Sequence, residues 1–454
     1  MKVGVISLGC PKNLTDTEAI LGLLVDSGYE ITNDQNEAEI MIINTCAFIG
    51  EARDEAFEII KETGKLKSKG KLKYLVVAGC LPKRDKEELF DKYEEIDAIV
   101  GPGSIDRIVS VLNKLQHFAP AAKRRGFQNS SSGTATFSRR FRISLLDGTH
   151  CLFTHKTPRL KATPNYYAYI KIADGCDNHC SYCIVPSLRG KYQSRPMASI
   201  VSEVKNLVKT GLKEAILVAQ DTTMYGTDIY GKLSLHILCK KLAAIRGLEW
   251  IRIMYAHPAH VTDKLIEVMA KEPKIVKYLD LPIQHSCDNI LRSMRRRISA
   301  NGLKCLIEKL RRKIPGIAIR TSVIVGYPNE SSSDFNKLKT FIEEERFERL
   351  GVFRYSRESG TPAAKLGDQI GGRIKDQRFH ELMRLQRAIS AKSLKKMVGK
   401  IIKVLAEGNI GRSYMDAPDI DGVVKLNKCV PNGKIVSVRV TGSTPYDLSA
   451  VLLT

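Results

Sequence analysis

Residues 166–183 read Tyr166-Tyr-Ala-Tyr-Ile-Lys-Ile-Ala173-Asp-Gly-Cys176-Asp-Asn-His-Cys180-Ser-Tyr-Cys183. The first eight residues are a strand-like hydrophobic run, and the last eight place three cysteines in a C-x3-C-x2-C spacing. A structural zinc site usually closes with four ligands, whereas a three-cysteine iron–sulfur cluster leaves one iron open to another molecule. We therefore expect a cluster here. The alternative is a zinc ion completed by His179 or by a distant ligand.

A second set of cysteines, Cys10, Cys46 and Cys80, is spread along the first hundred residues. Each ends a hydrophobic run, and the runs are Val3–Leu8, Ile40–Ile43 and Tyr74–Val77. A helix-like stretch follows each run, and this βα alternation predicts a doubly wound parallel sheet. Ligands of such sheets bind beyond the carboxyl ends of the strands, where the three cysteines are expected to converge on a second cluster. Any one of them alone would be interpreted as a small buried hydrophobe.

The chain divides into four regions by composition and pattern. An α/β domain is expected over residues 1–116, and a linker rich in Ser, Gly, Thr and Arg over 117–160. Strand and helix patterns alternate again over 161–390, which predicts a partial (β/α) barrel. Short β segments over 391–454 predict a small antiparallel β-barrel. Residues 121–153 match no pattern and could be an insertion.

The formal net charge of +23 is distributed unevenly. Its regional values are −5 for residues 1–115, +8 for 116–165, +12 for 166–370, +8 for 371–403 and zero for 404–454. A strongly basic chain is typical of nucleic-acid binding. The longest apolar runs fall far short of the roughly 18 residues of a membrane helix, and no secretory leader is evident. We therefore expect a cytoplasmic protein without membrane contact.

The C-x3-C-x-aromatic-C run resembles the signature of the radical S-adenosylmethionine (SAM) enzymes. With the three N-terminal cysteines, the chain is similar to the methylthiotransferase family of that group. The strings that carry the resemblance are Ser7–Asn13, Ile42–Cys46, Val218–Thr223, Leu281–His285 and Arg412–Gly422. They are most similar to those of enzymes that methylthiolate an aspartate of small-subunit ribosomal protein twelve.

This resemblance implies an enzyme with two [4Fe-4S] clusters and SAM as cofactors. It also implies a methylthiotransferase N-terminal domain over 1–116, a radical SAM core over 161–390 and a TRAM-like barrel over 391–454. The cluster on Cys176, Cys180 and Cys183 would cleave SAM to a 5′-deoxyadenosyl radical, which abstracts hydrogen from the β-carbon of the aspartate. The cluster on Cys10, Cys46 and Cys80 would supply the sulfur from a position facing the first. No side chain is expected to act as a catalytic acid or base.

Six further residues are expected to contact the cofactor by their place in the motifs. They are Tyr182, Arg195, Gln220, Asp221, Gln284 and Gly326. Gln220 and Asp221 correspond to the family segment near the SAM amino group, and Gly326 would allow the adenine to approach. Arg189 could also meet a carboxylate, although a solvated surface arginine is an equal interpretation for Arg189 and Arg195. His285 is interpreted as a ligand contact or as a structural histidine.

Two positions depart from the family pattern. Asn329 and Ile298 each stand where the family commonly has glycine, and both positions lie in expected loops. The departures therefore concern local geometry more than activity.

The main alternative function is the methylthiolation of an adenosine in transfer RNA. The tail argues against it, because residues 404–454 have no net charge although RNA-binding surfaces are basic. Asp416, Asp419 and Asp421 would suit a basic ribosomal protein, unless they only form turns. A non-enzymatic RNA-binding or scaffold protein with structural clusters would have no use for two open irons.

The expected partners follow from this choice of function. They are ribosomal protein twelve, either free or within the ribosomal subunit, and an electron-donor protein. Nucleic-acid contact is expected to be secondary. It would run through a basic helix over Arg373–Lys403, which could equally be a solvated face.

Overall fold

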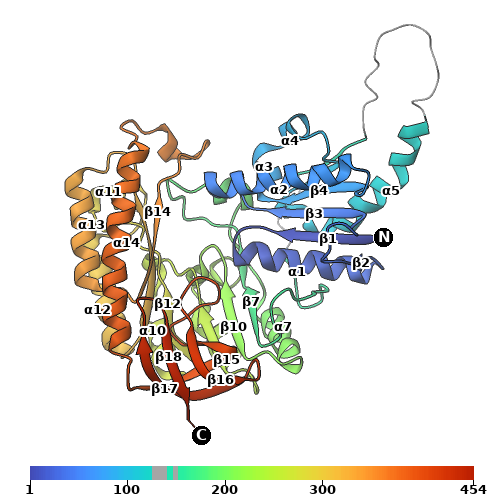
Figure 1. Ribbon diagram of the computed structural model, residues 1–454. Coiled ribbons are helices and arrows are strands. Elements are labelled where there is room, and N and C mark those ends of the chain that lie inside the picture. The colour runs from blue at the N-terminus through green and yellow to red at the C-terminus, as the bar shows by residue number, and fades with distance from the viewer. Residues whose placement is uncertain (125–140, 147–151, 454) are drawn as a thin grey trace. The chain divides into compact units, whose positions relative to one another are not determined.

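The computed structural model describes residues 1–124, 141–146 and 152–453 (Figure 1). The chain forms two compact units. The first contains residues 1–162 with the short segment 184–191, and the second contains 163–183 and 192–454. Residues 121–153, which matched no pattern in the sequence, lie largely outside the described ranges.

The first unit is built on a six-stranded parallel sheet in the order β2-β1-β3-β4-β5-β6. Its strands are β1 (Lys2–Ser7), β2 (Glu30–Ile31), β3 (Ile40–Thr45), β4 (Tyr74–Gly79), β5 (Ala98–Val100) and β6 (Ile143–Leu145). Its helices are α1 (Pro11–Asp26), α2 (Gly50–Ser68), α3 (Cys80–Asp85), α4 (Glu88–Lys92), the 3-10 helix η1 (Pro102–Arg107), α5 (Ile108–Arg124) and α6 (Val185–Arg189). Strand β6 lies inside the range expected as a linker and extends the sheet beside β5.

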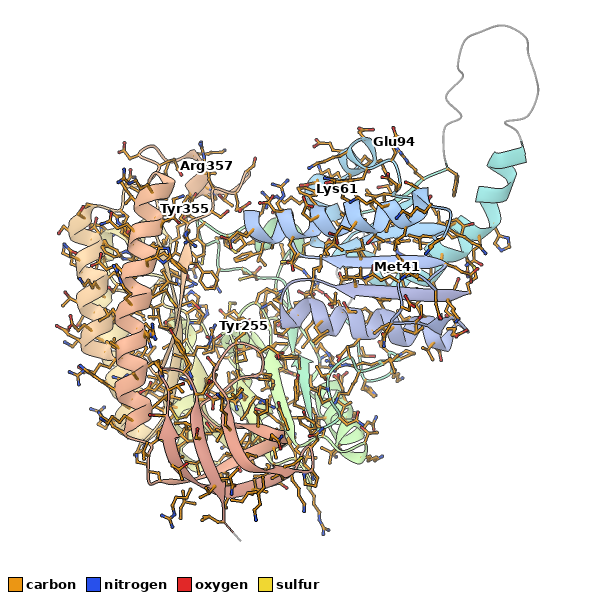
Figure 2. All side chains as sticks on the ribbon, viewed as in Figure 1. Met41, Lys61, Glu94, Tyr255, Tyr355 and Arg357 are labelled. Carbon is orange, nitrogen blue, oxygen red and sulfur yellow. The ribbon has the colours of Figure 1, made fainter. Side chains whose placement is uncertain are left out.

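Both faces of this sheet are covered, as a parallel sheet requires. Ile40 and Ile42 of β3 pack in the core that contains residues of α1, whereas Met41 and Ile43 pack in the core that contains residues of α2. Figure 2 labels Met41 on β3, and Figure 1 shows α1 and α2 on opposite faces. The chain leaves β1 for the edge strand β2 and returns as β3 on the other side. The switch point of this doubly wound sheet therefore lies between β1 and β3.

The second unit contains a six-stranded parallel sheet whose strands follow one another in chain order, which is an open, partial (β/α) barrel. Its strands are β7 (Tyr167–Lys171), β10 (Glu214–Val218), β11 (Trp250–Ile253), β12 (Ile275–Asp280), β13 (Ala318–Val325) and β14 (Arg349–Arg354), and a separate pair is β8 (Ala173–Asp174) with β9 (Gln193–Ser194). Its helices are α7 (Met197–Lys209), η2 (Thr222–Met224), α8 (Thr227–Tyr230), α9 (Leu235–Ala243), η3 (Pro258–His260), α10 (Asp263–Lys271), α11 (Asp288–Ser293), α12 (Ala300–Lys313), α13 (Ser332–Glu345), η4 (Pro362–Lys365) and α14 (Gly372–Lys395).

The helices of the barrel pack through one apolar stripe each. In α12, Leu303, Ile307 and Leu310 recur at helical spacing and are buried in the main core, as expected for an amphipathic helix. Helix α13 begins with a capping box between Ser331 and Asp334, which satisfies two backbone donors at its start. Figure 1 shows α13 and α14 side by side, and α14 packs on β14.

The tail closes into a small barrel of four strands in the order β15-β16-β18-β17. They are β15 (Ile401–Ser413), β16 (Val424–Val430), β17 (Ile435–Ser443) and β18 (Leu448–Leu452). Neighbouring strands are antiparallel except β16 and β18, which pair in parallel. The fold class is therefore the expected one: a doubly wound sheet, a partial (β/α) barrel and a small β-barrel.

One expected element ends early. The basic helix expected over Arg373–Lys403 stops at Lys395, and β15 begins at Ile401. Gly399 between them has a φ of 87°, which breaks helical geometry, and the β-branched pair that follows favours a strand. Among the described helices, none combines the length and the apolar character that a bilayer crossing demands.

Candidate functional site

The three N-terminal cysteines follow three neighbouring strands of the first sheet. Cys10 comes after β1, Cys46 directly after β3, and Cys80 directly after β4, and these strands lie side by side in the order β1-β3-β4. The carboxyl ends of parallel strands share one edge of a sheet. The thiols are therefore placed at the switch point, where doubly wound folds bind ligands.

Side-chain amides and hydroxyls tie the three cysteine-bearing loops together. The Asn13 amide donates to the carbonyl oxygens of Leu8 and Thr45, both at 2.9 Å. The Asn44 amide donates back to the Asn13 carbonyl at 3.0 Å. The Thr45 hydroxyl donates to the carbonyl of Ala78, just before Cys80, at 2.6 Å. Since these bonds are buried, the loops are held in one arrangement.

Gly9 allows the first loop to approach the second. Its φ is +91°, and a Cβ at this position would lie 2.5 Å from the Cβ of Cys46 and 3.1 Å from its Sγ. Only glycine suits both the left-handed backbone and this contact.

Arg189 of α6 lies against this cysteine set. Its guanidinium donates to the Asp16 carboxylate at 2.7 Å and to the Asn13 amide oxygen at 2.6 Å, and it is 4% exposed. The interpretation of Arg189 as a surface arginine is therefore wrong. Arg195 is equally buried, but its guanidinium meets Glu203 of α7 at 2.7 Å and the Lys171 carbonyl at 2.7 Å, so it is not a surface side chain either.

The three N-terminal thiols have different electrostatic environments. Burial, with a smaller contribution from the neighbouring Cys10 and Cys80, raises the pKa of Cys46 to about 12. Burial also raises the pKa of Cys80, although Arg189 opposes the shift. Burial alone would raise the pKa of Cys10, but Lys12, the backbone of Asn13 and Arg189 lower it overall. The pKa of Cys46 is therefore raised by both neighbouring thiols. Arg189 offsets part of the negative charge that three thiolates would bring.

The second cysteine set lies in the loop after β8. Cys180 is buried, the backbone N–H of Cys183 donates to the Cys180 carbonyl at 3.0 Å, and His179 is exposed in the left-handed region with a φ of 44°. The exposed His179 is therefore not arranged as a ligand beside the cysteines. Burial raises the pKa of Cys176 to about 11.

A further group of possible metal ligands lies beside Asp221. The ligand atoms of Asp221, His257 and His260 all lie within 4.8 Å of one another.

Asp221 and Gln220, at the end of β10, do contact the cysteine loop. Asp221 accepts hydrogen bonds from the Asn178 amide at 2.7 Å and from His260 Nδ1 at 2.8 Å. Gln220 donates to Asp174, just before the loop, at 2.7 Å, and its own buried amide oxygen has no partner among the residues that the structure describes. Burial alone would raise the pKa of Asp221, but the hydrogen bond from His260 and further donors lower it to about 2. The loop is thus anchored on an ionised carboxylate.

Gln284, Tyr182 and Gly326, three further residues expected to contact the cofactor, have different surroundings from one another. Gln284 has a φ of 71° and its backbone bridges to Val323 of β13. Tyr182 packs in a cluster that contains Tyr327 and Tyr355, and Figure 2 labels Tyr355, one residue past β14. Gly326 has a φ of 71°, and a Cβ there would lie 2.3 Å from Cγ of Lys375. The close approach at Gly326 is therefore made by Lys375.

His285 is fully buried, and its Nδ1 accepts from the Cys287 backbone at 3.0 Å. Burial lowers its pKa to about 3, so the ring is neutral. Its Nε2 has no partner among the described residues.

Sequence reasoning missed four residues of this site. They are Asp174, Asn178, His260 and Arg296, and Arg296 donates to Cys180 Sγ at 3.8 Å. Nothing in the run Arg295-Arg-Arg297 indicates which arginine turns inward. The signal for the other three was equally weak, because their partners are distant in sequence.

Two of the three aspartates of the tail loop are engaged within the fold. Asp416 is buried and accepts from Arg349 at 2.5 Å, and Asp421 accepts from the Tyr278 hydroxyl at 2.8 Å. Asp419 alone of the three is exposed. The expectation that these aspartates face a basic ribosomal protein is therefore wrong for Asp416 and Asp421, because the partial barrel already neutralises them.

Arg412 also joins the small barrel of the tail to the partial barrel. It pairs with Glu214 at 2.6 Å, and Arg252 pairs with Glu214 at 2.7 Å. Since Glu214 begins β10, this network lies toward the amino ends of the strands, the end associated with stability in (β/α) barrels.

Comparison with known proteins gives consistent results along the chain. Residues 2–101 match the model of the Uncharacterized protein family UPF0004, residues 170–342 match the Radical SAM superfamily, and residues 398–453 match the TRAM domain. The ribosomal protein uS12 methylthiotransferase RimO of Desulforamulus reducens is 44% identical, over 99% of this chain and 99% of its own. RimO of Trichlorobacter lovleyi is 44% identical, over 100% of this chain and 98% of its own.

Solved structures agree on the fold. The radical SAM methyltransferase TsrM of Kitasatospora setae superposes with a TM-score of 0.55 at 15% identity, over 80% of this chain and 73% of its own. The cobalamin-dependent S-adenosylmethionine radical enzyme OxsB superposes with a TM-score of 0.52 at 11% identity, over 85% of this chain and 56% of its own.

Proposed function

The chain belongs to the family of the ribosomal protein uS12 methylthiotransferases RimO, and from this membership we propose that it transfers a methylthio group to the β-carbon of one aspartate of uS12. The observation that carries the proposal is 44% identity along nearly the whole length of a relative so named. The placement of the six cysteines at strand ends supports it, because each trio lies where its fold class binds ligands.

The radical SAM core binds a [4Fe-4S] cluster and SAM, and we assign Cys176, Cys180 and Cys183 as the cluster ligands. When bound, these groups supply a 5′-deoxyadenosyl radical able to abstract hydrogen from an unactivated C–H bond. The chain's own residues then orient and shield the site. Asn178 and Asp174 hold the ligand loop on Asp221 and Gln220, and Tyr182 packs against the cluster that contains Tyr327 and Tyr355. No side chain is proposed as acid or base.

Cys10, Cys46 and Cys80 are proposed to hold the second cluster, from which the sulfur is inserted. Two observations support this assignment: the three loops are tied together by buried hydrogen bonds, and Arg189 offsets negative charge beside the thiols. A set of structural cysteines would need neither of these features.

Two variants separate the roles of the clusters. Cys46→Ala is expected to abolish methylthiolation while SAM cleavage to 5′-deoxyadenosine continues, because the radical is made at the other cluster. Cys180→Ala is expected to abolish both. Product formation by Cys46→Ala would refute the second-cluster assignment.

Transfer RNA is the competing substrate, favoured by the TRAM match and opposed by the zero net charge of residues 404–454. The test incubates the reconstituted protein with SAM and a reductant, together with uS12 or transfer RNA. A methylthio mass gain on uS12, located to one aspartate, is expected. A gain on the RNA alone would replace the proposed substrate.

A contact with ribosomal RNA is proposed as secondary, with uS12 presented in the ribosomal subunit. Helix α14 supports it, because its two acidic residues, Asp376 and Glu381, are paired with Arg354 and Lys339. Its exposed cations form no ion pair in the part of the chain that the structure describes, and they are Arg373, Arg384, Arg387, Lys392 and Lys395. An electron-donor protein completes the proposed partners.

A further inference from the structure

Arg296 is turned inward by the end of α11. The N–H of Arg296 donates to the Leu291 carbonyl at 2.8 Å, the N–H of Arg295 donates to the Arg292 carbonyl at 3.0 Å, and Arg295 has a φ of 56°. This is the Schellman arrangement, in which the residue after the left-handed position leaves the helix in a fixed direction. A non-glycine residue in the left-handed region is uncommon, so the turn is held by its surroundings.

The cysteine loop is fastened to the same helix end. The Ser181 backbone N–H donates to the Met294 carbonyl at 3.1 Å, and its hydroxyl donates to the Ser293 carbonyl at 2.7 Å. Cys180, the residue before Ser181, therefore has a defined position relative to Arg296.

Arg296 is 8% exposed, and its guanidinium is only partly satisfied. One terminal nitrogen donates to the Pro282 carbonyl at 2.6 Å, and the other donates to Cys180 Sγ at 3.8 Å. Its Nε is buried and finds no acceptor among the described residues. Nor does any described carboxylate form an ion pair with it.

A buried cation without a carboxylate is costly. A carbonyl and a thiol sulfur together do not balance its charge, and a leftover buried donor adds to the cost. A bound iron–sulfur cluster on Cys180 would bring negative charge and sulfur acceptors to this place. An anionic partner placed here would therefore stabilise the guanidinium of Arg296.

We propose that Arg296 is a hydrogen-bond donor and counter-charge to the cluster of Cys176, Cys180 and Cys183, and that it raises the reduction potential of that cluster. The inference rests on the proposed function only in assigning the cluster to these cysteines. Reduction adds an electron to an already anionic group, and a nearby cationic donor stabilises the more negative form. Hydrogen bonds to the sulfurs and nearby charge are established determinants of cluster potential.

The test measures the midpoint potential of the SAM-responsive cluster in full-length, reconstituted protein. Arg296→Met keeps an unbranched, flexible side chain but removes charge and donors, and is expected to lower the potential. At a fixed solution potential the ratio of reduced to oxidised cluster should fall about tenfold, which corresponds to about 59 mV for a one-electron couple. Arg296→Lys, which keeps the charge, should shift the potential less.

Arg297→Met is the matched control, because Arg297 is the exposed neighbour, and its potential should equal that of the unaltered protein. An unchanged potential in a fully loaded Arg296→Met variant would overturn the proposal and leave Arg296 with only a structural bond to Pro282. If the Met variant does not load, Arg296→Gln carries the same test. If the unaltered protein holds no SAM-responsive cluster, the proposed function itself fails.

Discussion

Gly9 is the single residue on which the geometry of the first cysteine set most depends. Its neighbours Leu8 and Cys10 link a strand to a helix, and its missing side chain makes room for Cys46. Gly28 offers the same backbone geometry without the contact, because its φ is +82° and nothing lies within 4 Å of a Cβ there.

Gly9→Ala is expected to prevent formation of the second cluster. The left-handed backbone costs about 1–2 kcal/mol for an L-residue, and the new methyl group would displace Cys46. Iron content after reconstitution should fall to that of Cys46→Ala, while SAM cleavage continues. Gly28→Ala should show the same backbone cost in urea unfolding with full iron content. Full iron content in Gly9→Ala would show that the loop adapts.

Asn329 shows how a departure from a family pattern can be physically neutral. It stands where glycine is usual, and the structure gives it a φ of 64°. Asparagine is among the non-glycine residues that best tolerate this region. The position therefore needs a left-handed backbone, and the substitution keeps it.

At the scale of elements, α14 carries much of the basic excess of residues 371–403. Among its exposed cations, Arg384 and Arg387 are three residues apart, and so are Lys392 and Lys395, so each pair lies on one helix face. A solvated face would more usually interleave charges of both signs, whereas the two acids of this helix are engaged by neighbouring strands and helices.

Charge reversal on this face tests the RNA contact. The double variant Arg384→Glu with Arg387→Glu should weaken binding to small-subunit ribosomal RNA, and the slope of log affinity against log salt should become shallower by about 1–2. Methylthiolation of free uS12 should not change.

The control reverses two exposed lysines of α9, Lys240→Glu with Lys241→Glu, and changes net charge equally. Equal losses in both double variants would mean that only net charge matters.

At the scale of the second unit, the small barrel is fastened to the partial barrel by buried charges. Glu214 is fully buried between Arg252 and Arg412. Burial alone would raise the pKa of Glu214, but Arg412 and Arg252 bring it below its usual value. A carboxylate with a lowered pKa in the folded state stabilises the fold above its unfolded pKa, and that contribution is lost as pH falls through the folded value.

Glu214→Gln is therefore expected to lower the free energy of unfolding by about 3–5 kcal/mol at pH 7, because it removes the buried carboxylate that Arg252 and Arg412 share and leaves Arg412 with Glu407 alone. The difference from the unaltered protein should narrow below a pH of about 4.5, the ordinary pKa of glutamate. The urea midpoints of unfolding of both proteins, measured at pH 7 and below a pH of about 4.5, give this difference. Glu249→Gln, at an exposed position, should change neither midpoint. A difference that stays constant with pH would refute the ionised state of Glu214.

The succession of strands and helices could be predicted because it is a local property. Hydrophobic runs before Cys10, Cys46 and Cys80 became β1, β3 and β4, since apolar periodicity and chain punctuation act over a few residues. The end of α14 was missed. Helix propensity extends through Lys396, and only the left-handed Gly399 and the pairing of β15 with β17 decide where the strand begins.

The amino-acid sequence by itself determined the two cysteine trios, the alternation that places them at strand ends, and the family to which the chain belongs. The tertiary structure alone decided which charged groups are available. It buried Asp416 and Asp421 against Arg349 and Tyr278, and it selected Arg296 from three successive arginines to face Cys180. The physical reason is that spacing is written in consecutive residues, whereas burial and charge pairing depend on side chains that only folding brings together.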